Sequence, residues 1–321
     1  MSSARTTRTE VIDSFGGPDQ FRSGERQLAA PGAGEVQVRV AAAAVNPVDL
    51  STRAGMVIPA DAADFPMVIG WDAAGTIEGV GEGVTDWQVG DRVAAMVVQP
   101  GDQKGTYAEH IDVAADLIAR VPEGVSLEQA ATIPLAGLTA SQMLAWVNVP
   151  VGGTLLVDAP LGAVGRFVVQ LARTAEITVV AVTEPEDRDA VLELGAAEVV
   201  HRGDFTAAVR ELHPDGVDAA IDLVGGDTAH ASLASVRDGG AYITAVPPFA
   251  DDTGPFTSER EIRVEVQNVH PDTPVLARLL DAVSRGKLTS SIELTYPLEK
   301  AAEAHRRQAQ GGLRGKLVLV P

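Results

Sequence analysis

The chain has no cysteine among its 321 residues. This absence excludes disulfides, thiolate nucleophiles, iron–sulfur clusters and any zinc site that uses cysteine ligands. Basic residues are also few, because 25 Lys and Arg face 44 Asp and Glu and leave a net charge of −19. The overall field therefore repels nucleic acid and anionic membranes, and we expect neither as a partner.

Long apolar runs are missing as well. Apolar residues make up 45% of the chain, but charged residues, Gly or Pro interrupt them before any run reaches the ~20 residues that span a bilayer. The first ten residues are polar and lack the apolar stretch of a secretory signal, so we expect a cytoplasmic protein. The length exceeds the usual size of one hydrophobic core and favours two domains.

The pattern of the chain changes near Ser126. Between residues 35 and 121 it consists of short β-rich segments separated by glycine-rich turns, as in the alternating Val36-Gln-Val-Arg-Val40. A helical stretch opens at Ser126, a good N-cap residue. Sequence typical of strands returns at residues 291–296 and 316–320, on either side of a charged helix predicted at residues 298–308. We therefore predict one domain from residues 1–125 and 286–321, and a second from residues 126–285.

Strands and helices alternate through the second predicted domain. We expect strands at residues 154–157, 177–182, 198–200 and 219–223, and helices at residues 164–174, 188–194 and 205–212. Further strands at 241–246 and 263–268 bring the number to six, and residues 274–285 supply another helix. Such alternation is typical of an α/β fold with a doubly wound parallel sheet.

The segment from Ala159 to Gly165 joins the first of these strands to its helix. A dinucleotide needs small residues at such a turn, because the backbone must approach the pyrophosphate and the helix N-terminus supplies amides. Gly162 and Gly165 meet this need. The first glycine of the usual G-x-G-x-x-G pattern is absent, and Pro160 removes one amide donor. An ordinary loop that uses glycines for packing is the alternative interpretation.

Several further segments resemble one known family. They include Ala44-Val-Asn-Pro-Val-Asp49, Ile69-Gly-Trp-Asp-Ala-Ala-Gly75, Gly105-Thr-Tyr-Ala-Glu-His110, Asp222-Leu-Val-Gly-Gly226 and Gly315-Lys-Leu-Val-Leu319. In this order they resemble the zinc-independent medium-chain dehydrogenases/reductases of the quinone oxidoreductase type. The resemblance implies a GroES-like β-rich catalytic domain built from both chain ends, a Rossmann domain between them, and an active-site cleft at their junction. It also implies NADPH as cofactor and a homodimer.

The resemblance extends to a missing metal site. Zinc-dependent relatives carry a cysteine where this chain has Asn46, and Gly-His-Glu where it has Gly70-Trp71-Asp72. We therefore expect no metal. Without a Lewis acid the substrate must itself accept hydride easily, as quinones and α,β-unsaturated carbonyls do.

The sequence contains signals for NADPH and signals for NADH. An acid about 20 residues past the turn favours NAD, and basic residues there favour NADP. Glu184 follows the second strand, whereas Arg188 and Arg202 lie nearby; surface charges are the alternative for both arginines. We expect NADPH, with NADH open. The predicted cofactor residues are Ala159, Pro160, Leu161, Gly162, Ala163, Val164, Gly165, Thr183, Glu184, Arg188, Arg202, Val224, Ala245, Val246, Pro247, Arg314 and Lys316.

Catalytic residues are harder to assign. The resemblance implies Asn46 and Asp49 at the cleft and Thr139 beside the nicotinamide, while a turn, a helix cap and a core hydroxyl are equally good alternatives. It implies a substrate pocket of Asn46, Ser51 and Trp71. Many relatives have a tyrosine where this chain has Ser51, so proton delivery from solvent is a hypothesis.

Three functions remain open from the sequence. The first is an NADPH-dependent reductase of a quinone or enone as small-molecule substrate. The second is a reductase of an enoyl thioester or polyketide intermediate, which needs the same hydride chemistry. The third is a cofactor-binding sensor or scaffold with little turnover, because a fold does not establish activity.

Overall fold

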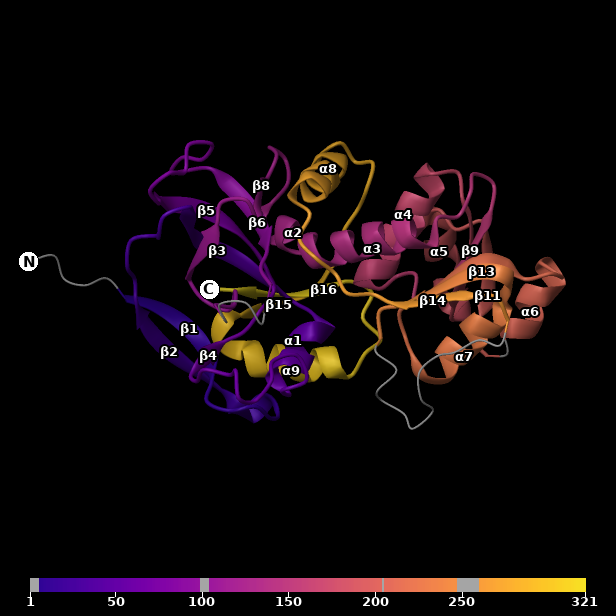
Figure 1. Cartoon of the computed structure of the whole chain (residues 1–321), viewed down its shortest axis with the longest axis horizontal. Coiled ribbons are helices and arrows are strands. Elements are labelled where there is room, and N and C mark those ends of the chain that lie inside the picture. The colour runs from indigo at the N-terminus through magenta and orange to yellow at the C-terminus, as the bar shows by residue number, and fades with distance from the viewer. Residues whose placement is uncertain (1–5, 99–103, 204, 247–259) are drawn as a thin grey trace, which may run out of the picture. The chain divides into compact units, whose positions relative to one another are not determined.

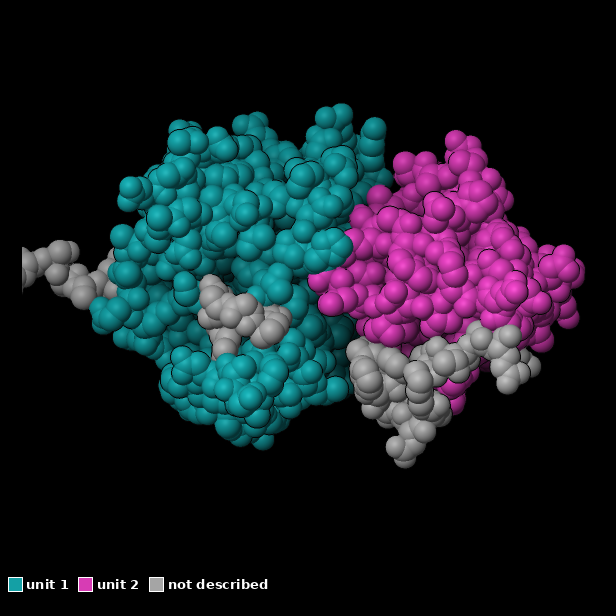
Figure 2. All heavy atoms as spheres, in the orientation of Figure 1, with its two compact units in different colours: residues 1–138, 270–321 teal, residues 139–269 magenta. Residues whose placement is uncertain are grey.

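The computed structural model describes residues 6–98, 104–203, 205–246 and 260–321, and it forms two compact units. Unit 1 contains residues 1–138 and 270–321, and unit 2 contains residues 139–269 (Figure 2). The division falls later than the predicted change at 126, because helix α2 (Leu127–Ala131) packs on strands of unit 1. It falls before 286, because α8 (Thr273–Ser284) packs on the unit 1 strand β8 (Ile118–Arg120).

Unit 1 is built on two sheets. One has the order β15-β16-β3-β5-β6-β8, with β7 also paired to β3, and the other has the order β2-β1-β4 (Figure 1). The remaining strands are β1 (Thr6–Ile12), β2 (Phe21–Gln27), β3 (Glu35–Val45), β4 (Met67–Val68), β5 (Asp72–Val80), β6 (Arg92–Met96), β7 (His110–Ala114), β15 (Ile292–Pro297) and β16 (Lys316–Val320). This is the β-rich GroES-like half that the sequence predicts, and the last strand closes it by pairing with β3.

The core of unit 1 follows from the alternation along β3. Val36, Val38 and Val40 are buried, as their period of two predicts for one face of a sheet. Besides α2 and α8, unit 1 contains the short helices α1 (Pro47–Arg53), η1 (Pro18–Gln20) and η4 (Leu298–Lys300), the last leading into α9 (Ala301–Ala309).

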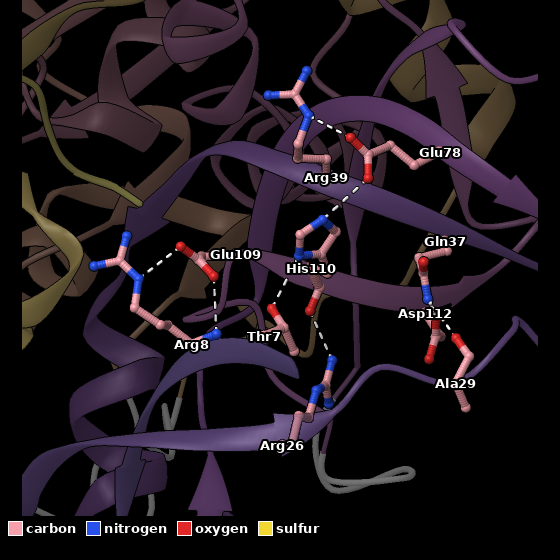
Figure 3. A network of polar contacts seen from close by, with 10 residues as sticks. All are labelled: Thr7, Arg8, Arg26, Ala29, Gln37, Arg39, Glu78, Glu109, His110 and Asp112. Carbon is pink, nitrogen blue, oxygen red and sulfur yellow. Dashed lines mark hydrogen bonds and ion pairs between the residues drawn. The ribbon is translucent and has the colours of Figure 1, made fainter. Parts of the chain in front are cut away.

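A polar network ties the two sheets of unit 1 together (Figure 3). The buried ring of His110 on β7 contacts Thr7 Oγ1 on β1 through Nδ1 at 3.0 Å, and Glu78 Oε2 on β5 through Nε2 at 3.2 Å. Arg39 Nε donates to Glu78 Oε1 at 2.7 Å, and Arg26 Nη2 donates to the His110 carbonyl at 2.7 Å. His110 therefore holds strands of the two sheets together.

Unit 2 contains a six-stranded sheet of order β11-β10-β9-β12-β13-β14, in which every pairing is parallel. The strands are β9 (Thr154–Asp158), β10 (Thr178–Thr183), β11 (Glu198–His201), β12 (Val217–Asp222), β13 (Val236–Thr244) and β14 (Arg263–Val266). The helices are α4 (Ala163–Thr174), η2 (Pro185–Asp187), α5 (Arg188–Leu194), α6 (Phe205–Leu212) and α7 (Gly226–Ser235), and α3 (Pro134–Val147) enters from unit 1. The predicted six-stranded doubly wound sheet is confirmed.

The order of these strands explains where a ligand would bind. β9 lies between β10 and β12, so the chain reverses its winding direction beside the carboxyl end of β9. In such sheets ligands bind at this switch point. Among the residues that the structure describes, no helix has the length and apolar character needed to cross a membrane.

Candidate functional site

The turn after β9 has the geometry of a phosphate-binding loop. Gly162 is the N-cap of α4, so the free amides of the first helical turn follow it directly. A Cβ on Gly165 would lie 2.3 Å from the Ala159 carbonyl oxygen, so only glycine allows the helix to start this close to the turn. The turn offers a close backbone approach and a positive helix end, which is the cradle that a pyrophosphate requires.

The two departures in this turn also have structural consequences. Ala159 adopts a φ of 44°, a left-handed conformation that costs a residue with a side chain about 1–2 kcal/mol. Pro160 and Leu161 are buried, and the Gly162 amide donates to the Ala159 carbonyl at 3.0 Å. The turn thus places a residue with a side chain at a left-handed position at the cost of strain at Ala159, and the loop keeps its tight form.

Glu184 and Arg202, which are predicted to contact the adenosine ribose of the cofactor, form an ion pair. Glu184 follows β10 and Arg202 follows β11, two neighbouring parallel strands. Their side chains lie 3.5 Å apart (Oε1 to Nε), and each is about half exposed. Arg188 is exposed at the start of α5. The two residues that favour opposite cofactors in the sequence therefore contact each other.

The other predicted cofactor residues lie at several places. Thr183 is buried at the end of β10, Val224 is exposed after β12, and Ala245 and Val246 are half-buried after β13. Arg314 is exposed before β16. Pro247 lies outside the described residues. Thr139 of unit 2 is 4% exposed, and within the described part of the chain its Oγ1 has no hydrogen-bond partner.

Unit 1 gathers Asn46, Asp49, Asp72 and Lys316 into one buried cluster. Asp49 Oδ2 accepts from the Asn46 amide at 2.7 Å and caps α1, as the helix-cap alternative predicts. Asn46 Nδ2 donates to Asp72 Oδ2 at 3.0 Å, and Lys316 Nζ donates to Asn46 Oδ1. Lys316 Nζ lies 3.8 Å from Asp72 Oδ2, and the Leu135 amide donates to Asp72 Oδ1 at 2.9 Å.

Three residues that the sequence did not single out extend this cluster. Tyr107 OH donates to Asp49 Oδ2 at 3.0 Å and lies 3.0 Å from His305 Nε2, while Arg53 Nη1 lies 3.2 Å from His305 Nδ1. Because the phenol has one proton, its oxygen accepts from Nε2, and Nδ1 then accepts from Arg53. No spacing in the sequence links Tyr107 to His305, which lies 198 positions later.

Burial dominates the electrostatics of the cluster. It raises the pKa of Asp49 to about 7 and that of Asp72 to about 6, and it lowers the pKa of Lys316. Burial also lowers the pKa of His305 to about 3 and raises that of Tyr107. Neutral His305 agrees with the hydrogen-bond directions above.

The predicted substrate-pocket residues lie next to this cluster. Trp71 is 6% exposed and its Nε1 donates to Thr52 Oγ1 at 3.4 Å, while Ser51 is half-buried and donates to the Pro47 carbonyl at 3.4 Å. Asn46 and Asp49 are fully buried. A direct contact of either with a substrate therefore requires local opening of unit 1.

Comparisons with known proteins agree with this architecture. Residues 32–123 match the alcohol dehydrogenase GroES-like domain, and residues 194–319 match the zinc-binding dehydrogenase family. The chain is 32% identical to a 2-haloacrylate reductase of a Burkholderia species, over 97% of this chain and 98% of that protein. The chain belongs to the medium-chain dehydrogenases/reductases, in the quinone oxidoreductase family.

Solved structures of the same family superpose over the whole length. The quinone oxidoreductase from Coxiella burnetii has a TM-score of 0.88 at 28% identity, covering 99% of this chain and 100% of that one. A mycobacterial protein complexed with NADPH has a TM-score of 0.84 at 31% identity, covering 98% and 100%. Homologues of this kind are oxidoreductases with a nicotinamide cofactor, and this chain is one of them.

One of the two matching families is described as zinc-binding, but this chain has few side chains that could serve as zinc ligands at the predicted positions. The chain has no cysteine, and Asn46 and Trp71 are hydrogen-bonded within unit 1. Over the described ranges, no three side chains from His, Asp and Glu gather in a group that could hold a metal ion. In this member of the family, the Lys316 ammonium stands beside Asp72.

Proposed function

We propose that this protein is an NAD(P)H-dependent reductase that transfers hydride to a quinone or an α,β-unsaturated carbonyl without zinc. The turn from Ala159 to Gly165 carries the proposal. Its helix N-terminus and the close approach at Gly165 fit a pyrophosphate. The chain also belongs to a family with a member that is complexed with NADPH. When bound, the reduced nicotinamide supplies the hydride.

Thr139 is the best candidate for a contact to the reacting end of the cofactor. A buried hydroxyl without a partner costs free energy, and a ligand that bonds it recovers that cost. The amides after Gly162 would hold the pyrophosphate, and Glu184 with Arg202 would face the adenosine ribose. Asn46 and Asp49 were predicted as catalytic residues; since both are fully buried, we propose that they position neighbouring residues of unit 1.

The proposed substrate class follows from a mechanism in which no metal ion polarises the carbonyl. Asn46 and Asp72 stand at positions that the resemblance assigns to the zinc site of zinc-dependent relatives, and here they bond each other and contact Lys316, so the carbonyl must be activated by its own conjugation. A haloacrylate, as in the name of the Burkholderia relative, is a conjugated alkene of this kind. Solvent is the proposed proton source.

NADPH is the proposed cofactor. Arg202 supplies a cation next to the predicted ribose site, and the mycobacterial relative is complexed with NADPH. Glu184 favours a free ribose hydroxyl and keeps NADH as a second cofactor. We also propose a homodimer in the cytoplasm, with catalytic and cofactor domains that correspond to the two units.

Titration with NADPH and NADH tests the cofactor, followed by oxidation assays with a quinone, an enone and an enoyl thioester. Tight NADPH binding with turnover of the quinone or the enone is the expected result. Turnover of the enoyl thioester alone would favour the second enzyme function, and binding without turnover would favour a sensor. Failure of both cofactors to bind contradicts the proposal.

A further inference from the structure

Two buried aspartates lie side by side where β9 and β12 end. Asp158 is 1% exposed and Asp222 is 0% exposed. β9 and β12 are parallel neighbours whose last paired residues are Val157 and Ile221, so the two aspartates that follow lie next to each other. Two carboxylates that share one buried site repel each other, so one of them keeps a proton. Burial and then the negative charge of Asp222 raise the pKa of Asp158 well above its usual value, which agrees with a shared proton.

The pair also fixes the loop after β12. Asp158 Oδ1 accepts from the Leu223 amide at 2.6 Å. Asp222 Oδ1 accepts from the amides of Val224 at 3.1 Å and Gly225 at 2.9 Å. Three consecutive amides therefore end on the two carboxyls. This loop contains Val224, one of the predicted cofactor residues.

The same pair reaches the loop after β13. Thr244 Oγ1 donates to Asp222 Oδ2 at 2.6 Å and accepts from the Val246 amide at 3.0 Å. Asp158 itself directly precedes the turn that begins at Ala159. The loops that follow three neighbouring strands, β9, β12 and β13, thus depend on two side chains that lie beneath them.

Hydroxyl groups lie next to the pair, and charged groups lie on the elements packed around it. Tyr242 OH on β13 donates to Asp222 Oδ2 at 2.9 Å, and burial raises its pKa. Helix α7 packs on β9, β12 and β13 and supplies Ser232 Oγ, which donates to Asp158 Oδ2 at 3.2 Å. Its titratable residues Asp227 and His230 are exposed, as is Glu184 after β10. Helix α4 packs on β9 and carries the half-buried Arg166.

We propose that Asp158 and Asp222 form a positioning group whose shared proton holds the loops after β9, β12 and β13 in the conformation that binds the dinucleotide. Loss of the proton at alkaline pH places two negative charges in contact in a buried site. Repulsion then moves at least one carboxyl, the amides of residues 223–225 lose an acceptor, and cofactor binding weakens. The inference rests on the proposed cofactor function but concerns side chains below the site.

The test measures the dissociation constant of NADPH from pH 7 to pH 10, above the range in which the cofactor phosphates titrate. We expect the affinity of the wild-type protein to fall at least tenfold with the loss of one proton. In Asp158→Asn the amide replaces the proton as donor to Asp222, and the affinity should not depend on pH over this range. Asp218→Asn is the matched control, because Asp218 lies on the same β12 but bonds Arg237 and Thr154. It should keep the wild-type fall.

An infrared measurement without cofactor separates this inference from the proposed function. The difference spectrum between wild type and Asp158→Asn at pH 7 should contain the carbonyl band of a protonated carboxyl, because the buried Asp49 contributes equally to both proteins and cancels. A missing band in this difference, a constant affinity to pH 10, or a fall retained in Asp158→Asn overturns the inference. If neither cofactor binds at any pH, the proposed function fails; a band would then show only the shared proton, and the positioning role would be overturned.

Discussion

The two units bury one pair of aspartates each, and they offset its charge in different ways. In unit 1, Asp49 and Asp72 lie in a cluster with the ammonium of Lys316, which is 3.8 Å from Asp72. In unit 2, Asp158 and Asp222 lie next to each other on neighbouring strands, and amides and hydroxyls donate hydrogen bonds to both. Unit 1 uses a cation together with a proton on Asp49, and unit 2 uses a proton without a cation among these contacts.

The difference affects how each unit responds to its surroundings. A cation must come from a side chain, and Lys316 lies 270 positions after Asn46, so its bond ties the last strand to the start of α1. A proton requires no distant residue, but it can leave when the pH rises. The cation of unit 1 therefore contributes to closing the fold, whereas a proton can respond to pH in either unit.

The largest expected effect is the loss of the cation. In Lys316→Met, Asp72 loses its buried positive neighbour and Asn46 Oδ1 loses its donor. Removal of one partner of a buried pair costs about 3–5 kcal/mol, which urea unfolding measures. Lys300→Met is the control, because Lys300 makes an exposed pair with Glu303 and should change stability by less than about 0.5 kcal/mol. Equal effects of the two variants would contradict the role of Lys316.

The second prediction concerns the proton held in unit 1 itself. The pKa of Asp49 is about 7 in the folded protein, above its ordinary value of 3.8, so the folded chain keeps a proton that the unfolded chain releases. The free energy of unfolding should therefore fall as the pH rises from about 4 to 7, by at most about 1.4 kcal/mol per pH unit from this group.

Asp49→Asn tests this slope, since an amide has no proton to lose. The variant should gain stability relative to the wild type between pH 5 and pH 7, and urea unfolding at several pH values measures the difference. Asp72 and Lys316 titrate in the same cluster and remain in both proteins. The exposed Asp86 provides the control as Asp86→Asn. A constant difference between wild type and Asp49→Asn across this range would show that Asp49 is ionised throughout.

The sequence predicted the parts of this structure that depend on local pattern. The six parallel strands, their helices and the turn at residues 159–165 follow from periodicity and from glycine placement. The helix-cap alternative for Asp49 also follows from its position three residues after Asn46. These features involve residues that are close along the chain, so a single sequence contains them.

The contacts that give the clusters their chemistry were not predicted. Tyr107 and His305 meet across 198 positions, and Asp158 and Asp222 meet because two strands far apart in sequence become neighbours. Glu184 and Arg202 indicated opposite cofactors when taken separately, and their ion pair appears only once β10 and β11 are adjacent. The family resemblance gave the fold but not these partners, since it transfers motifs and not side-chain contacts.

Two buried threonines of unit 2 sharpen the comparison further. Thr244 bonds Asp222 and Val246, whereas Thr139 Oγ1 has no partner in the described part of the chain. Thr244→Val should cost about 1–3 kcal/mol of stability. Thr139→Val should leave stability unchanged or higher and should lower cofactor affinity or turnover about tenfold, or about 1.4 kcal/mol. Thermal unfolding and steady-state kinetics separate the two, and unchanged kinetics in Thr139→Val would reject its proposed contact.

The smallest effect should come from the exposed Glu184–Arg202 pair, the opposite extreme from Lys316 and Asp72. Both side chains are about half exposed, so Glu184→Gln should change stability by less than about 0.5 kcal/mol. It frees Arg202 for a 2′-phosphate and removes an acceptor for a ribose hydroxyl. The ratio of NADPH to NADH affinity should therefore rise about fivefold, or about 1 kcal/mol. Glu186→Gln makes the same charge change on the neighbouring η2, so an equal rise there would assign the effect to net charge and not to the ion pair.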